Sequence, residues 1–189
     1  EVIGDRGSYS FNPVTNMTIP ALFYGSCQVT SSADIVAFVQ MRVINTGEAA
    51  AYEAIRSDTP DTGVMVPLVA KRLANGFATV VTIQNLNTTT AATVDLIYTP
   101  SAEYIASGGS SAVITIDDVT IGAGGSVLQN HRLLSGANTV PELPERWYGT
   151  LEVRSDQPVA AFVQLTVMPS INPNVPGGDN FMAHNAFSF

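Results

Sequence analysis

Two histidines and a single cysteine are the residues of this chain best suited to metal binding or acid–base chemistry. His131 and His184 lie far apart in the sequence, and no His-x-x-x-His, Cys-x-x-Cys or His-Glu-x-x-His pattern occurs. A zinc site needs three or four ligands, which usually come in closely spaced pairs. We therefore predict no metal site, and we interpret His131 as a loop residue and His184 as an ordinary strand residue.

Nucleophilic catalysis is not indicated either. Cys27 would need a basic side chain beside it, and the Gly-x-Ser-x-Gly sequence that presents a catalytic serine is absent. The glycine-rich residues 108–110 and 122–125 lack the lysine and the following helix of a phosphate-binding loop, so they are interpreted as hairpin turns. No catalytic residue and no cofactor is predicted, and the chain is not predicted to be an enzyme.

Two other kinds of pattern could place a ligand or a modification on the surface. The polar pairs at 117–118 and 179–180 could help to hold Ca²⁺, although no regular calcium-binding loop is present. Asn16 and Asn87 each begin an Asn-x-Thr sequence, which is the acceptor pattern for glycans. These two asparagines are the candidate glycosylation sites, and surface glycans are possible partners.

Composition excludes two classes of partner. The chain has 189 residues, of which 46% are apolar and 13% charged, and its formal net charge is −8. An acidic protein repels the phosphates of nucleic acid and of anionic membrane surfaces. The longest apolar stretches, such as Val64 to Ala70, are far below the roughly 20 residues that span a bilayer. We expect no nucleic-acid binding and no membrane insertion.

The elements that must position these residues are short β-strands. Segments with alternating or β-branched residues are separated by Gly, Pro, Asn or Ser, as in antiparallel β-sandwiches. Residues 92, 94, 96 and 98 share one apolar face, and residues 159, 161, 163, 165 and 167 share another. The predicted strands are Met65–Ala70, Ala78–Asn85, Ala92–Tyr98, Ser110–Val119, Ser126–Gln129, Gly149–Arg154, Val159–Val167 and Phe181–Phe187. No amphipathic helix is predicted, apart from a possible turn near Leu133 or Glu142.

An internal repeat is the strongest pattern in the sequence. Residues 24–43 align with residues 148–167 at a constant offset of 124, and nine of the twenty aligned positions are identical. Residues 51–55 then match residues 183–187, and Gly7-Ser8 matches Gly125-Ser126. The alternative is that two strand–turn–strand units converged on similar patterns. The alignment places Cys27 opposite Leu151, which predicts a buried, unreactive thiol.

The two copies are unequal. The second copy is predicted to be a complete module over residues 64–189. Residues 1–63 match only its later part, so they are predicted to be the C-terminal half of such a module followed by a linker. Its predicted strands are Ser8–Phe11, Ser26–Thr30, Ile35–Ile44 and Ala49–Ile55.

A set of strand and turn motifs occupies residues 66–69, 75–79, 81–86, 148–150, 155–159 and 183–187. Together these motifs resemble a tandem β-sandwich repeat found in long secreted bacterial surface proteins. The resemblance implies an all-β, antiparallel, immunoglobulin-like fold and an extracellular structural or adhesive role. It implies no catalytic residues.

Half of a sandwich has one sheet face uncovered and open strand edges, which favour pairing with another chain. Either the row Val36, Phe38 and Gln40 or the opposite row should face solvent. The inter-subunit or core-edge candidates are Ile35, Ala37, Val39, Met41, Val43 and Phe38. Because donor and acceptor surfaces differ, the contact would be head to tail and would grow into a filament unless a ring closes. The prediction is a structural subunit of an extracellular filament or cell-surface assembly, whose partners are copies of itself.

The alternative is an adhesin or carbohydrate-binding module of a surface stalk. Trp147 and Tyr148 would then form a platform on which sugar rings stack. The repeat aligns Trp147 with Phe23, which favours a packing role for both residues instead.

Overall fold

The structure, a computed structural model, is all-β with antiparallel strands. It describes residues 2–13, 15, 18–20, 25–42, 48–56, 61–173 and 180–189. The strands are β1 (Phe38–Arg42), β2 (Ala49–Glu53), β3 (Gly63–Ala70), β4 (Phe77–Asn85), β5 (Ala92–Pro100), β6 (Ile114–Ile121), β7 (Ser126–Asn130), β8 (Tyr148–Ser155), β9 (Val159–Val167), β10 (Phe181–Asn185) and β11 (Phe187–Ser188). One short helix, α1 (Ala102–Ala106), follows β5.

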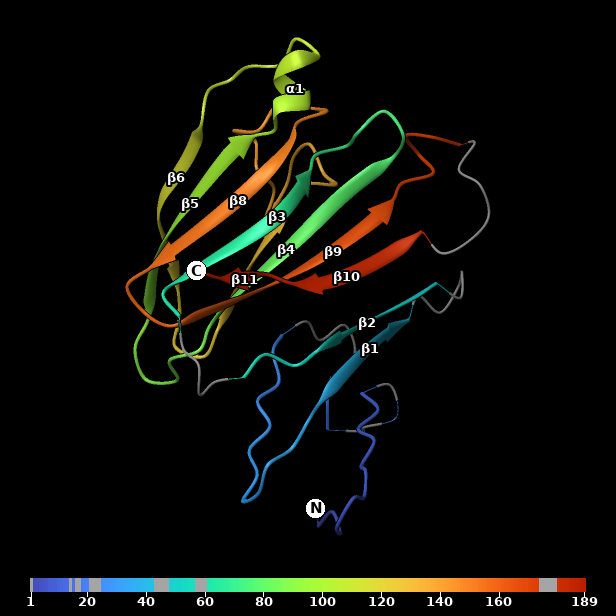
Figure 1. Cartoon of the computed structure of the whole chain (residues 1–189), viewed down its shortest axis with the longest axis vertical. Coiled ribbons are helices and arrows are strands. Elements are labelled where there is room, and N and C mark those ends of the chain that lie inside the picture. The colour runs from blue at the N-terminus through green and yellow to red at the C-terminus, as the bar shows by residue number, and fades with distance from the viewer. Residues whose placement is uncertain are drawn as a thin grey trace.

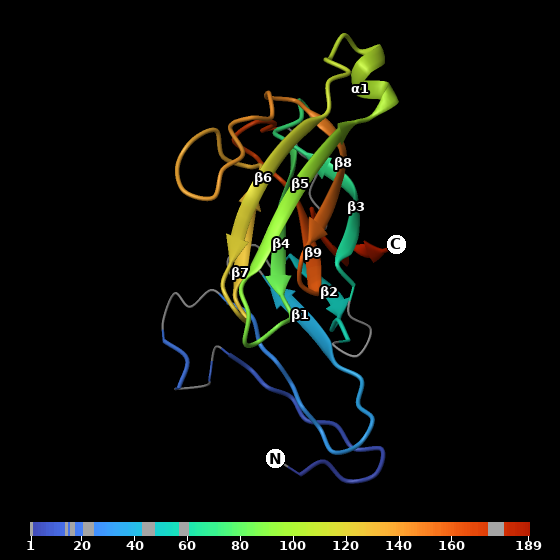
Figure 2. The ribbon, with the colours of Figure 1, turned by 90° about the vertical axis from the view of Figure 1, so that its left-hand side faces the viewer.

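Two sheets pack face to face and enclose one core (Figures 1 and 2). The first sheet has the order β10-β9-β4-β7, and the second has the order β11-β3-β8-β5-β6. Strands that are distant in the sequence are neighbours, since β3 pairs with β8 and β4 pairs with β9. A separate two-stranded sheet, β1-β2, lies outside this sandwich.

Alternation along the strands places the core side chains. Ala92, Val94, Leu96 and Tyr98 of β5 are all fully buried, as their spacing predicts. Leu151 and Val153 of β8 meet them from the neighbouring strand, and Val159, Ala161 and Val163 of β9 face them from the other sheet. The strands predicted between residues 64 and 167 are present, with bounds that differ by a few residues. The single strand predicted at 181–187 is instead two strands, β10 and β11, which belong to different sheets.

Helix α1 is not anticipated by the sequence. Ser101 caps it, because its side-chain oxygen accepts the backbone N–H of Tyr104 at 3.1 Å. The helix has five residues and buries none of them fully, so no amphipathic period could reveal it. The possible turns near Leu133 and Glu142 form no helix.

The N-terminal part of the chain forms fewer strands than its sequence predicts. The predicted strands at 8–11 and 26–30 are wrong, since both segments are exposed and have no strand pairing. Residues 38–42 and 49–53 do form a hairpin. Residues 2–13 lie at the end of the molecule opposite to α1 (Figure 1).

Candidate assembly surface

The hairpin β1–β2 repeats the hairpin β9–β10 in structure as well as in sequence. Phe38 pairs with Glu53, and the matching residue Phe162 pairs with Asn185. The whole register agrees, because every β1–β2 pair has its counterpart in β9–β10 at offsets of 124 and 132. Even the backbone bond beside the hairpin recurs: Ala54 N–H donates to Ala37 O at 2.9 Å, and Ala186 N–H donates to Ala161 O at 2.9 Å.

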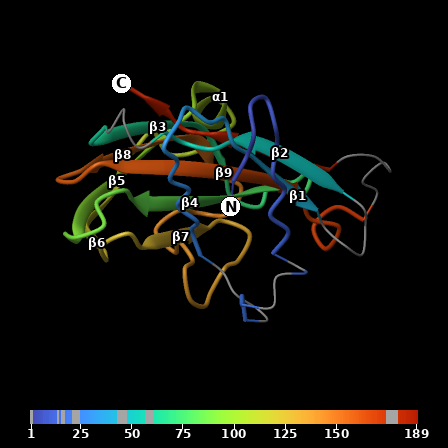
Figure 3. The same ribbon diagram turned by 90° about the horizontal axis from the view of Figure 1, so that it is seen from below.

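One face of the hairpin packs on the outer face of the sandwich (Figure 3). The Tyr52 ring lies 4.0 Å from the Phe162 ring, centroid to centroid. Gln164 Nε2 donates to the Met41 sulfur at 3.2 Å, and Asn185 Nδ2 donates to the Glu53 carbonyl at 2.8 Å. This face is half-buried, and it carries Ala37, Val39 and Met41.

The opposite face of β1 points to solvent. Phe38 is 72% exposed and Val36 is 73% exposed, and Gln40 beside them is exposed as well. Of the two rows considered from the sequence, the solvent-facing one is therefore Val36, Phe38 and Gln40. Ile35, from the other row, lies before the strand and is 45% exposed, while Val43 lies outside the described residues.

One edge of β1 has no strand beside it among the described residues. Successive residues of a strand direct their backbone N–H and C=O groups to opposite sides. Since the Ala37 carbonyl points to the β2 side, the backbone groups of Phe38, Gln40 and Arg42 point to the open side. In the sandwich, the same side of β9 is paired along its whole length with β4.

Cys27 is exposed, so the prediction of a buried thiol is wrong. Its counterpart Leu151 is fully buried, because β8 lies between β3 and β5 and faces the other sheet. The segment around Cys27 has no such neighbours among the described residues. Its contact with the sandwich is slight: Ser26 Oγ donates to the Gly124 carbonyl at 3.3 Å.

A buried polar cluster lies inside the sandwich, and sequence reasoning missed it. His131 is fully buried; its Nδ1 lies 3.1 Å from Thr79 Oγ1, and its Nε2 lies 3.3 Å from Tyr98 Oη. Burial lowers the pKa of His131 to about 3, and the nearby Lys71 acts in the same direction. Burial also raises the pKa of Tyr98 above its ordinary value. His131 is thus a neutral structural residue: it lies in the turn after β7, as the loop prediction has it, but its side chain is buried in the core.

Lys71 and Trp147 complete the same end of the core. Lys71 is 2% exposed, and its Nζ donates to the carbonyls of Val140 and Leu143 at 2.5 and 2.6 Å. Burial lowers the pKa of this lysine. Trp147 is 1% exposed and meets the Tyr98 ring edge to face at 5.8 Å. Its ring is not available to stack on a sugar, so the predicted Trp147 platform is wrong and the predicted packing role is confirmed.

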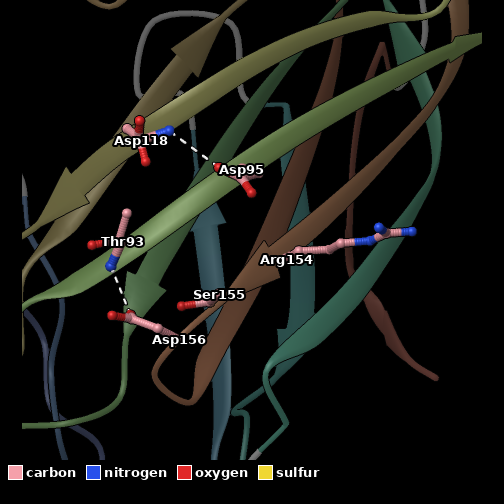
Figure 4. A pocket seen from close by; sticks show the side chains of 6 residues that line it. All are labelled: Thr93, Asp95, Asp118, Arg154, Ser155 and Asp156. Atoms are coloured by element: carbon pink, nitrogen blue, oxygen red, sulfur yellow. Dashed lines mark hydrogen bonds between the residues drawn. The ribbon is translucent and has the colours of Figure 1, made fainter.

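A shallow depression of about 300 Å³ lies on the outer face of the second sheet (Figure 4). Asp95 Oδ1 accepts the backbone N–H of Asp118 at 3.1 Å, and Asp156 Oδ1 accepts that of Thr93 at 2.8 Å. Asp118 has φ 59°, next to a register shift between β5 and β6. The Asp95 carboxylate therefore stabilises the backbone of a β-bulge, and the Asp156 carboxylate caps the backbone of β5 beside it.

The described residues contain no group of three or more His, Cys, Asp or Glu side chains that could hold a metal ion. Asp117 and Asp118, considered for Ca²⁺, are exposed, and Asp179 lies outside the described residues. His184 is half-buried in β10, where its Nδ1 lies 3.0 Å from the Asn185 carbonyl oxygen.

The Asn87 side chain is engaged at both ends. Its Nδ2 donates to Gln157 Oε1 at 2.8 Å, and its Oδ1 accepts the backbone N–H groups of Thr89 and Thr90 at 2.9 and 3.1 Å. A glycan on Asn87 would have to displace the bond to Gln157. Asn16, the other candidate acceptor, lies outside the described residues.

No match to a protein family, to a curated protein or to a solved structure was found for this chain. Among the described residues, no helix has the length and apolar character needed to cross a membrane.

Proposed function

We propose that this chain is a structural subunit of an extracellular filament or cell-surface assembly. Neighbouring subunits join head to tail by β-strand complementation. The observation that carries the proposal is the hairpin β1–β2. It has the register of β9–β10, but no strand of the described residues lies at the edge where β9 has β4.

Exposed apolar side chains in the described N-terminal residues support the proposal. Nine of the seventeen large hydrophobic residues that are exposed lie between residues 2 and 55, although the sandwich supplies most of the described chain. Val36 and Phe38 lie on the same face of the chain at the start of β1, and an exposed apolar face of this kind is typical of a surface that a partner covers. An unpaired strand edge beside it offers backbone groups that another strand can satisfy.

The finer architecture belongs to the same proposal. Residues 64–189 would be one complete immunoglobulin-like module, and residues 1–63 would be the later half of a second one. The extracellular location follows from the resemblance to tandem repeats of secreted bacterial surface proteins.

Self-association tests this proposal. Sedimentation velocity over a range of concentrations, with negative-stain electron microscopy, should reveal oligomers that grow by one subunit at a time. Phe38→Lys should shift the association to higher concentration, because it places a charge on the exposed face of β1. The control is Leu134→Lys, at a residue that is 52% exposed in the connection between β7 and β8. A monomer at every concentration, for both variants and the native chain, would overturn the proposal.

A further inference from the structure

We infer that the open edge of β1 accepts one antiparallel strand with the character of β4, supplied by a neighbouring subunit from a segment that is not already paired inside a sandwich. The inference rests on the proposed function and names the partner of that surface. The expected segment is extended and rich in β-branched residues, like residues 77–85 of this chain.

The pairing of β4 in the sandwich is the template. β4 lies between β9 and β7: Val80 pairs with Gln164 on one side and with Asn130 on the other. Gln40 is the repeat counterpart of Gln164, so the incoming strand should place its Val80-like residue opposite Gln40. Residues 8–11 match the start of β7, and they are the second neighbour that such a strand would have.

The pattern of formed and unformed strands at the N-terminus supports this assignment. The segments that match β9 and β10 pair with each other, and both are strands. In the sandwich, β7 pairs with β4, and β8 pairs with β3 and β5. The described N-terminal residues contain no counterparts of those three strands, and residues 8–11 and 25–31 are not strands. Residues 8–11 and 25–31 therefore have a sequence that forms strands in the sandwich, but no strand of the described N-terminal residues is available to pair with them.

The donor is not the β4 of this same chain. That strand is hydrogen-bonded along both edges, to β7 and to β9. Taking it from the sandwich would expose Val81 and Ile83, which are fully buried. A strand from outside the sandwich has no such cost.

Edge pairing is compatible with the docked hairpin. The open backbone groups lie in the plane of the β1-β2 sheet, whereas Tyr52 and Met41 meet the sandwich through one of its faces. The incoming strand therefore leaves the contact between Tyr52 and Phe162 in place.

A synthetic peptide with the sequence of residues 74–88 tests the inference, with a scrambled peptide as the control. Fluorescence anisotropy should show that the labelled peptide binds the full chain. Amide hydrogen exchange should show new protection at Phe38, Gln40 and Arg42, with Val39 and Met41 unchanged because they already face β2.

Peptide methylation tests the orientation. In the sandwich, the Leu86 N–H points to the β9 side and the Asn85 N–H points to the β7 side. The even-numbered N–H groups should therefore face β1. N-methylation at Val80 and Thr82 should weaken binding about tenfold or more. N-methylation at Val81 and Ile83 should weaken it less.

A variant of the chain gives the complementary test. Gln40→Pro removes an N–H from the open edge, where proline is tolerated, and should weaken peptide binding. Retained protection of the Ala54 amide would show that the hairpin is intact. Should the hairpin be lost, Phe38→Pro is the second variant at the same edge.

The inference is overturned if the native chain does not bind the peptide up to about 1 mM, a concentration that corresponds to roughly 4 kcal/mol of binding. Equal weakening by the two methylated peptides, or binding without protection of Phe38, Gln40 and Arg42, overturns it too. Self-association that the peptide does not inhibit would uphold the proposed function and overturn this inference. Peptide binding by a chain that stays monomeric at every concentration would uphold this inference and overturn the proposed function.

Discussion

Acidification should destabilise this protein through His131. The histidine is fully buried and neutral, and it contacts Thr79 and Tyr98 through its two ring nitrogens. In the unfolded chain the ring is free to take up a proton near its ordinary pKa. The perturbation is a fall in pH from 7.5 to 4.5, applied to the native chain and to His131→Gln.

The sign and size of the change in the free energy of unfolding follow from the pKa of His131 in the unfolded and in the folded chain. The pKa is about 6.5 in the unfolded chain and about 3 in the folded one. The unfolded state therefore binds the proton first, and stability falls as the pH drops below about 6.5. The loss is ~2 kcal/mol at pH 5 and ~3 kcal/mol at pH 4.5, and it levels off near ~5 kcal/mol below pH 3.

Urea unfolding at a series of pH values measures this effect. Carboxylates also titrate near pH 4.5, so the informative quantity is the difference between the two proteins. His131→Gln is expected to be less stable at pH 7.5, because the polar cluster is broken, but its stability should fall less on acidification. His184→Gln is the control, since it removes a histidine and leaves His131 in place.

Parallel curves of unfolding free energy against pH for the native chain and His131→Gln would contradict a buried, neutral His131. If the native chain and His131→Gln lose the same free energy of unfolding between pH 7.5 and 4.5, within about 0.5 kcal/mol, then His131 is not held neutral by burial. The assignment of the pH dependence to His131 would also be contradicted if His184→Gln reduced the loss of unfolding free energy on acidification as much as His131→Gln does.

Two further predictions use matched positions. Leu151→Ala should cost roughly 2–5 kcal/mol in chemical denaturation because it opens a cavity in the core, whereas Cys27→Ala at the repeat counterpart should stay within about 0.5 kcal/mol. Equal costs would mean that the segment around Cys27 is packed like β8. Gly149→Ala should lower the melting temperature, since the added methyl would overlap the carbonyl of Thr99, while Gly122→Ala, with open space around it, should not. A melting temperature unchanged in both would contradict the close approach of β5 and β8.

Much of the sandwich was predictable because a strand has a local signature. Alternation with period two in residues 92–98 predicted both the strand and its buried face, and the structure confirms them. The strand at 159–167 is confirmed too, but its predicted face is fully buried only at Val159, Ala161 and Val163. The turns between strands were marked by Gly, Asn and Pro. Helix α1 escaped prediction because five residues do not make a detectable period.

The candidate surface was predictable only in part. The repeat identified the hairpin. One edge of β1 has no strand beside it in the described part of the chain, and the strand expected there stays a prediction. Which row of β1 faces solvent was left undecided, because both rows are apolar and the answer depends on docking against Phe162 and Gln164. The strands expected at 8–11 and 26–30 did not form, since a strand also needs a partner.

By itself, the sequence determined the all-β class, the spacing of the strands and the relation between the two hairpins. These properties depend on side-chain alternation and turn residues, which are local. Only the tertiary structure decided that His131, Lys71 and Trp147 are buried while Cys27 is exposed. Burial depends on which distant segments cover a residue. The same residue pattern is buried in β8, which lies between β3 and β5, and exposed at residues 25–31, which have no neighbouring strands among the described residues.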